Sequence, residues 1–157
     1  MQRVTASPPS MPSPAQGSMR IPLMDRSLYF KGLLLLVAKD RVVGDEERAL
    51  MMDIGRIFSF EKRFCQEVID DILTNEHVVD EPPVFADPEI ARCFIRDGLR
   101  LSMSDGQMHE VEWTWLQSVG DHNGLEPGWC DALLRSAKEN EGSQLGDQLE
   151  ARSFVWE

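Results

Sequence analysis

The chain has 157 residues, 42% of them apolar, which suffices for one domain with a single core. Its net charge of −11 repels nucleic-acid backbones and anionic lipid surfaces but attracts cations and basic protein patches, so a nucleic-acid-binding function is disfavoured. The acidic charge is concentrated in residues 76–140, which carry 13 acidic and 5 basic side chains.

Residues 1–22 are rich in Pro and Ser, and we expect a flexible leader there, either native or left from a linker. The leader lacks the apolar core of a signal peptide, and the apolar run from Leu33 to Ala38 is far shorter than the ~20 residues that span a bilayer. The 3 cysteines are widely spaced without a CxxC motif, which indicates buried, reduced thiols and predicts a cytoplasmic protein.

Three helices are predicted in the first half of the chain. Apolar residues at helical spacing indicate a helix from Asp25 to about Lys39, a second that ends near Ser59 and a third that runs from Phe60 to about Asn75. Acidic residues fill the turn between the first two helices, so this half reads as helix, acidic turn, helix, helix.

The second half predicts the same order of elements. Residues 76–86 contain a Pro pair and form the joint, and Asp87-Pro88 suits the N-cap and first position of a fourth helix. A fifth helix follows a second acidic turn, and a sixth is expected to begin at Glu126-Pro127. Residues 141–157 form a polar tail that either packs back as a short seventh helix or stays loose.

The two halves align without a gap when the chain is shifted by 65 residues. The identical pairs in this frame include Leu34/Leu99, Asp40/Asp105, Glu47/Glu112, Gly55/Gly120, Glu61/Glu126 and Cys65/Cys130. We therefore predict an all-α domain over residues 23–140, a compact bundle of six to seven helices built from tandem repeats at 25–75 and 87–140.

Capping of helices is the simplest role for the two acidic turns. Gly44 and His109 would be N-caps, and Glu47 and Glu112 would occupy the third helical position, where a carboxylate accepts from the N-cap amide. Such a contact contributes about 1 kcal/mol.

A divalent cation site is the sharper hypothesis for the same turns. Asp40, Glu47, Asp105 and Glu112 would be its main ligands, because Ca²⁺ and Mg²⁺ prefer carboxylate oxygens. The secondary candidates are Asp45, Glu46, His109 and Glu110, and the histidine would extend the choice to Mn²⁺ or Zn²⁺. The pattern is not an EF-hand, because the twelfth position holds Met51 or Leu116 instead of Glu.

The second turn, Asp105-Gly106-Gln107-Met108-His109-Glu110-Val111-Glu112, resembles the helix-start motif of TerB-like domains, a group that includes tellurite-resistance proteins and the N-terminal region of the DjlA co-chaperone. The first turn departs from the motif by having Arg41 in place of Gly. The resemblance covers residues 25–140 and implies an all-helical module of bacterial stress-response or membrane-associated complexes, with Asp40, Glu47, Asp105 and Glu112 as metal ligands and no transferable catalytic activity.

Two other functions stay open beside a cation-binding scaffold. A metal-independent protein-interaction or co-chaperone-type module would use Trp113 and the terminal Trp156 as anchors for a partner with a basic or apolar side chain. If the protein is an enzyme, we expect a hydrolase whose metal is held by Asp105, His109 and Glu112. DNA binding is disfavoured, because Glu61-Lys62-Arg63 gives a recognition helix little positive charge.

Overall fold

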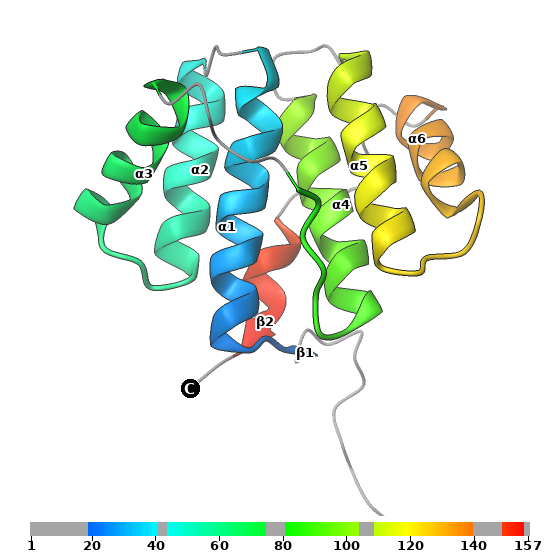
Figure 1. Ribbon diagram of the computed structural model, residues 1–157, viewed down its shortest axis with the longest axis horizontal. Coiled ribbons are helices and arrows are strands. Elements are labelled where there is room, and N and C mark those ends of the chain that lie inside the picture. The colour runs from blue at the N-terminus through cyan, green and yellow to red at the C-terminus, as the bar shows by residue number, and fades with distance from the viewer. Residues whose placement is uncertain (1–18, 41–43, 75–80, 104–108, 140–148, 156–157) are drawn as a thin grey trace, which may run out of the picture.

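The computed structural model describes residues 19–40, 44–74, 81–103, 109–139 and 149–155. In these ranges the chain forms a helical bundle with a two-residue strand near each end, which confirms the all-α prediction (Figure 1). In chain order the elements are β1 (Met19–Arg20), α1 (Leu23–Val37), η3 (Ala38–Asp40), α2 (Asp45–Ile57), α3 (Lys62–Thr74), α4 (Pro88–Ser102), α5 (Glu110–His122), α6 (Trp129–Glu139), η5 (Glu150–Ser153) and β2 (Phe154–Val155).

Helices α1 and α4 lie in the middle of the bundle, with α2 and α3 on one side and α5 and α6 on the other (Figure 1). Close approach of the central helices depends on small residues. A Cβ added to Gly32 would lie 2.8 Å from the ring of Phe94, and one added to Gly98 would lie 2.8 Å from Leu116. Both glycines are therefore needed for tight packing of α1 and α4 against their neighbours.

The predicted helix boundaries largely agree with the structure. Asp87 caps α4 by accepting a hydrogen bond from the Glu89 amide at 2.8 Å, and Pro88 is the first helical residue, as the sequence indicates. The sixth helix begins at Trp129 and not at Glu126. Gly128 has a φ of +87°, so the chain turns before the helix can start.

Asn123, at the end of α5, holds part of the joint between the two halves. Its side-chain oxygen accepts from the Phe85 amide at 2.8 Å, and its nitrogen donates to the carbonyl of Pro83 at 2.8 Å. The Ala86 amide donates to Asp25 on α1, also at 2.8 Å. Side chains of α1 and of the end of α5 thus satisfy residues 81–86, the described part of the connecting segment, which have no regular structure of their own.

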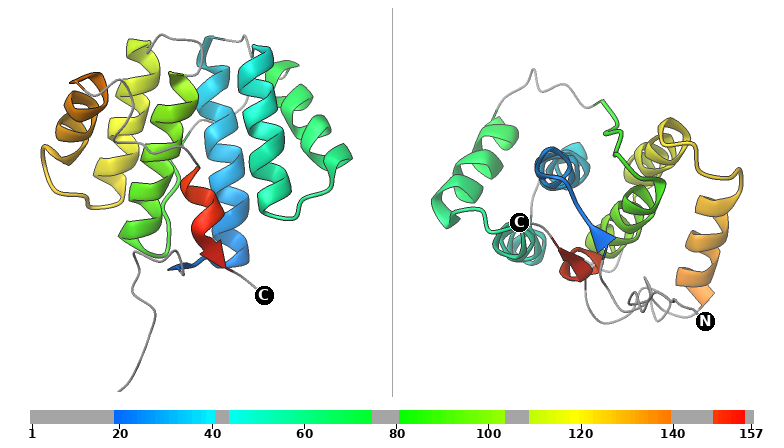
Figure 2. Two further views of the ribbon diagram at one scale, coloured as in Figure 1. Left: turned by 180° about the vertical axis from the view of Figure 1, so that it is seen from behind. Right: turned by 90° about the horizontal axis from the view of Figure 1, so that it is seen from below.

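Residues 149–155, here named the C-terminal strap, lie between α2 and α4 (Figure 2). Leu149, Ala151 and Phe154 are buried in the core. The polar tail thus does pack back in its last part, as a 3-10 helix and a strand.

Strand β2 of the strap pairs in parallel with β1, with Met19 opposite Phe154 and Arg20 opposite Val155. Composition predicts a flexible leader that includes residues 19–22, but Ile21 is 1% exposed and its amide donates to the Val155 carbonyl at 2.9 Å. The leader boundary at residue 22 is therefore too late. A two-residue strand has no periodicity from which it could be predicted.

Corresponding helices of the two halves share length and spacing. Helices α1 and α4 have 15 residues each and begin at Leu23 and Pro88, while α2 and α5 have 13 each and begin at Asp45 and Glu110. Both pairs keep the displacement of 65 residues found in the sequence. This correspondence fits the predicted tandem duplication, which stays a prediction.

Candidate functional site

The two acidic turns end in helix starts of the same construction. Gly44 is the N-cap of α2 and His109 that of α5, and each donates its amide to the side chain of the residue three positions on. The Gly44 amide lies 3.1 Å from Oε1 of Glu47, and the His109 amide lies 3.4 Å from Oε1 of Glu112. The capping role predicted for both glutamates is thereby confirmed.

Both glutamates are more deeply buried than surface carboxylates usually are. Glu47 is 8% exposed and Glu112 is 3% exposed, although each lies in the first turn of its helix. The positive end of a helix dipole stabilises the negative charge at this position. Two buried carboxylates in matching positions are the strongest feature that the structure adds to the cation-site hypothesis.

The starts of α2 and α5 lie at the same end of the bundle, beside the C-terminal ends of α1 and α4 (Figure 1). At this end Lys39 of η3 places its Nζ 5.1 Å from the ring centroid of Trp115 on α5, which joins the two halves by a cation–π contact. The structure therefore brings the two helix starts that follow the predicted turns to one end of the bundle.

The remaining predicted ligands are placed only in part. Asp45, Glu46 and Glu110 lie in the first turns of α2 and α5 and are exposed, while His109 is half-buried. Asp105 and the side chain of Asp40 lie outside the described part of the chain.

The carboxylate oxygens of the described residues are the kind of ligand that a hard cation prefers, but too few of them lie together. Within the described residues, no three His, Cys, Asp or Glu side chains gather as a metal site requires. A cation at Glu47 or Glu112 would need further oxygen ligands from Asp40 or Asp105. Among the described residues, the Ser102 hydroxyl, fully buried at the end of α4, has no hydrogen-bond partner.

The tryptophans differ in their surroundings. Trp115 is 7% exposed and belongs to the core. Trp113, proposed as a partner-binding residue, is half-buried and packs against the core. Trp129 is also half-buried, with the guanidinium carbons of Arg92 and Arg96 6.0 and 5.5 Å from its ring centroid. Trp156, the other proposed anchor, lies outside the described residues.

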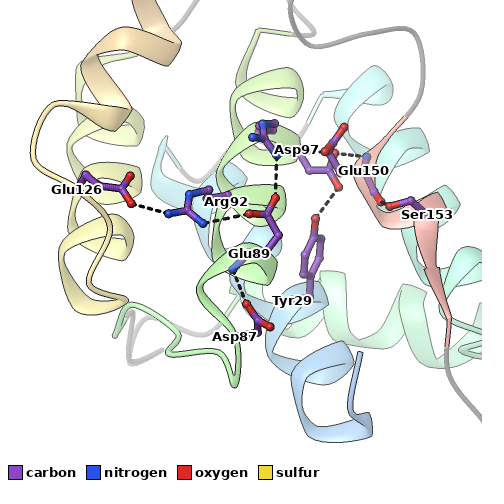
Figure 3. Close-up of polar contacts among 9 residues, drawn as sticks. Tyr29, Asp87, Glu89, Arg92, Asp97, Glu126, Glu150 and Ser153 are labelled. Atoms are coloured by element: carbon purple, nitrogen blue, oxygen red, sulfur yellow. Dashed lines mark hydrogen bonds and ion pairs between the residues drawn. The ribbon is translucent and has the colours of Figure 1, made fainter. Parts of the chain in front are cut away.

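Asp97 is a buried polar residue that the sequence analysis missed. Its side chain is fully buried on α4 and accepts a hydrogen bond from the Tyr29 hydroxyl at 2.7 Å (Figure 3). It also accepts from the amides of Glu150 and Ala151 at 2.7 and 3.0 Å, which fixes the first turn of η5. An Asp that directly follows one Arg and lies one turn before another, as Asp97 does with Arg96 and Arg100, usually indicates a solvated side chain, so nothing local distinguishes it.

Burial changes the ionisation of this network. Desolvation raises the pKa of Asp97 to about 7, although hydrogen bonds from Tyr29, Glu150 and Ala151 act in the opposite direction. Burial also raises the pKa of Tyr29 well above its usual value, and the charge of Asp97 adds to this effect. The network has the geometry of an anchor for the strap.

A ladder of ion pairs lies beside this anchor on α4 (Figure 3). Arg92 contacts Glu89 at 3.0 Å and Glu126 at 2.7 Å, and Arg96 contacts Glu150 at 3.3 Å. The ladder connects α4 to the loop before α6 on one side and to the strap on the other. It is partly exposed, so its main effect is to position these segments.

The cysteines have the surroundings of structural residues. All three are free thiols, and Cys65 and Cys93 are buried. Burial is the main cause that raises the pKa of Cys93 to about 12 and that of Cys130 to about 11. A thiol with a raised pKa is a poor nucleophile near neutral pH, so neither residue has the activated thiolate of a cysteine enzyme.

This chain matches no family model, no curated protein and no solved structure. None of the helices that the structure describes is both long and apolar enough to cross a membrane.

Proposed function

We propose that this chain is a TerB-like binding module of a bacterial stress response, with a divalent cation as the ligand of its acidic turns. The observation that carries the proposal is the pair Glu47 and Glu112: two buried carboxylates in the same helix-start position at the same end of the bundle. Helix N-termini favour negative charge, and both of these helix starts present a carboxylate at the same end of the bundle. Asp40 and Asp105 would complete the ligand set.

A metal-independent protein-interaction or co-chaperone-type module is the second candidate. It is favoured by the contacts of Glu47 and Glu112 with their N-cap amides, because capping alone gives both carboxylates a structural role. On this reading the acidic surface receives a protein partner with a basic or apolar anchor, and peripheral attachment to a membrane complex is one setting for it.

A substitution that keeps the cap and removes the charge separates the two candidates. Glutamine retains the Oε1 acceptor that the capping position requires, so Glu47→Gln/Glu112→Gln should fold with nearly unchanged stability. If a cation binds, wild-type protein titrated with Ca²⁺, Mg²⁺, Mn²⁺ and Zn²⁺ should show heat with one of them and a higher melting temperature. At 100 times the dissociation constant the stabilisation is about 2.7 kcal/mol.

The response should be lost in Glu47→Gln/Glu112→Gln and in Asp40→Asn/Asp105→Asn. It should persist in Glu61→Gln/Asp71→Asn, which removes two exposed carboxylates elsewhere. Absence of heat with all four ions at millimolar concentration would reject the cation site and leave the protein-interaction module. An unchanged response in both turn variants would place the ion elsewhere.

A further inference from the structure

A hollow of about 370 Å³ lies between α5 and the first turn of α6. The wall on α5 is formed by Thr114, Gln117, Ser118 and Asp121, which recur three, four and seven positions apart and so share one helix face. Its volume is in the lower part of the range of small-ligand pockets, which starts at about 300 Å³. The hollow lies at the C-terminal end of α5, the opposite end from the acidic turns.

The polar character of this face is unusual for a helix that lies beside another helix. An apolar stripe there would let α5 and α6 close on each other. At the matching position of α2, Met52 packs against the core, while Asp53 is paired with Arg56 and Arg152. The α5 face instead ends in a carboxylate, Asp121, where α2 has Arg56.

The carboxylates that line the hollow are only partly neutralised by basic side chains. Glu126 is paired with Arg92 at 2.7 Å, and Asp131 receives only the neutral Gln117 amide, at 3.2 Å. Within the described residues neither Asp121 nor Asp131 forms an ion pair. A concave wall focuses this negative field. The thiol of Cys130 in the wall is affected by it: after burial, the charges of Asp121 and Asp131 are what raise its pKa.

The rest of the wall is apolar. Leu125, Pro127 and the thiol of Cys130 face the hollow, and Leu125 is only 8% exposed. A cation that fits must therefore hydrogen-bond to carboxylates on two sides and place a weakly hydrated surface against apolar groups. A guanidinium group has both properties, since it is planar, carries five N–H donors and is less strongly hydrated than an ammonium group.

We propose that the hollow between α5 and α6 binds a guanidinium group, such as the side chain of an arginine on a partner protein. Asp121 and Asp131 accept its N–H groups from α5 and α6, and Leu125 and Pro127 contact its stem. This site is independent of the cation site at the acidic turns, so either can fail without the other.

The test uses paired probes that differ only in charge. N-acetyl-arginine amide should shift the backbone amide signals of residues 114–131 in a ¹⁵N-labelled full-length chain, with millimolar affinity that weakens as salt is added. N-acetyl-citrulline amide, its neutral counterpart, should cause no such shifts. A peptide with the same arginine that binds more tightly points to a protein partner, and equal affinity points to a small guanidinium compound.

Matched variants complete the test. Asp121→Asn/Asp131→Asn should weaken binding of the arginine probe about fivefold or more, since each exposed pair contributes up to about 1 kcal/mol. Glu61→Gln/Asp71→Asn, which removes the same charge from the other side of the bundle, should leave the affinity unchanged. Shifts spread evenly over the acidic surface, equal binding of the citrulline probe, or equal loss in both variants would each overturn the proposal.

Discussion

Asp97 links three parts of the chain through one buried carboxylate. Its partners are Tyr29, which lies 68 residues before it, and two amides of the strap at Glu150 and Ala151. Removing one partner from a buried hydrogen-bonded group costs about 1–3 kcal/mol, because the remaining groups stay desolvated. This residue should therefore affect the stability of the fold more than any exposed carboxylate.

Asp97→Asn should destabilise the chain by about 1–3 kcal/mol, because the new amide donor faces groups that are themselves donors. The loss should depend on pH. The pKa of Asp97 in the fold, about 7, exceeds its ordinary 3.8, so its stabilising contribution is complete below about pH 4 and disappears as the pH rises to about 7.

The asparagine variant lacks this titration, so the difference in unfolding free energy between wild type and variant should shrink from pH 4 to pH 7. Urea unfolding at several pH values in this range measures it. A difference that stays constant or grows over the range would contradict the raised pKa. Asp71→Asn, an exposed substitution on α3, serves as the control.

Whether the role of a residue could be predicted from the sequence depends on how far along the chain its partners lie. Glu47 and Glu112 were predictable as caps, because their partners lie three residues away and the relevant pattern is local. The partners of Asp97 are separated from it by at least 53 residues, and only the packed fold brings them together. The polar hollow between α5 and α6 was not predicted either, because it forms only when the two helices pack together.

At the scale of elements, the pair α2 and α3 and the pair α5 and α6 each have a glycine that contacts a cysteine of the other helix. In the first pair a Cβ on Gly55 of α2 would overlap Sγ of Cys65 on α3, and in the second a Cβ on Gly120 of α5 would lie 3.1 Å from Sγ of Cys130 on α6. Both contacts link residues that the sequence aligns at the displacement of 65.

Gly55→Ala should therefore destabilise the chain by roughly 1–3 kcal/mol, since overpacking at the α2–α3 contact outweighs the better helix propensity of alanine. Gly120→Ala should cost less, because the half-buried Cys130 can move. Thermal or urea unfolding gives both values. Introducing Gly55→Ala into a Cys65→Ala background should remove most of the penalty, and a full penalty there would show that the thiol is not the obstacle.

Helices were predictable because caps, turns and apolar spacing all act within a few residues. Asp87-Pro88 marked the start of α4 correctly, whereas Glu126-Pro127 marked a turn that precedes α6. The dipeptides are chemically alike, but Gly128 follows the second one with a positive φ and delays the helix. The strands β1 and β2 were not predictable, since each is two residues long and exists only through its partner.

At the scale of the whole molecule, the C-terminal strap holds the two halves together. It contacts α4 through Asp97 and α2 through Arg152, which pairs with Asp53 at 2.7 Å. Phe154 packs between Tyr29 and Phe58, with ring centroids 5.5 and 6.3 Å away. The bundle should therefore lose much of its stability when the strap is weakened.

Phe154→Ala should destabilise the chain by about 3–5 kcal/mol, the usual cost of removing a buried aromatic ring. Val155→Ala, next to it but 42% exposed, should cost far less and is the matched control. Arg152→Ala should cost at most about 1 kcal/mol, because its ion pair is near the surface. Urea unfolding measures all three, and similar losses for Phe154→Ala and Val155→Ala would refute a structural role for the strap.

The parallel pairing of β1 with β2 also determines how the molecule can be attached to anything else. Met19 and Phe154 lie opposite each other at the pole of the bundle away from the starts of α2 and α5 (Figure 1). The described chain therefore begins and ends at one pole of the bundle, so a support that holds residues 19 and 155 together would leave the starts of α2 and α5 on the far side.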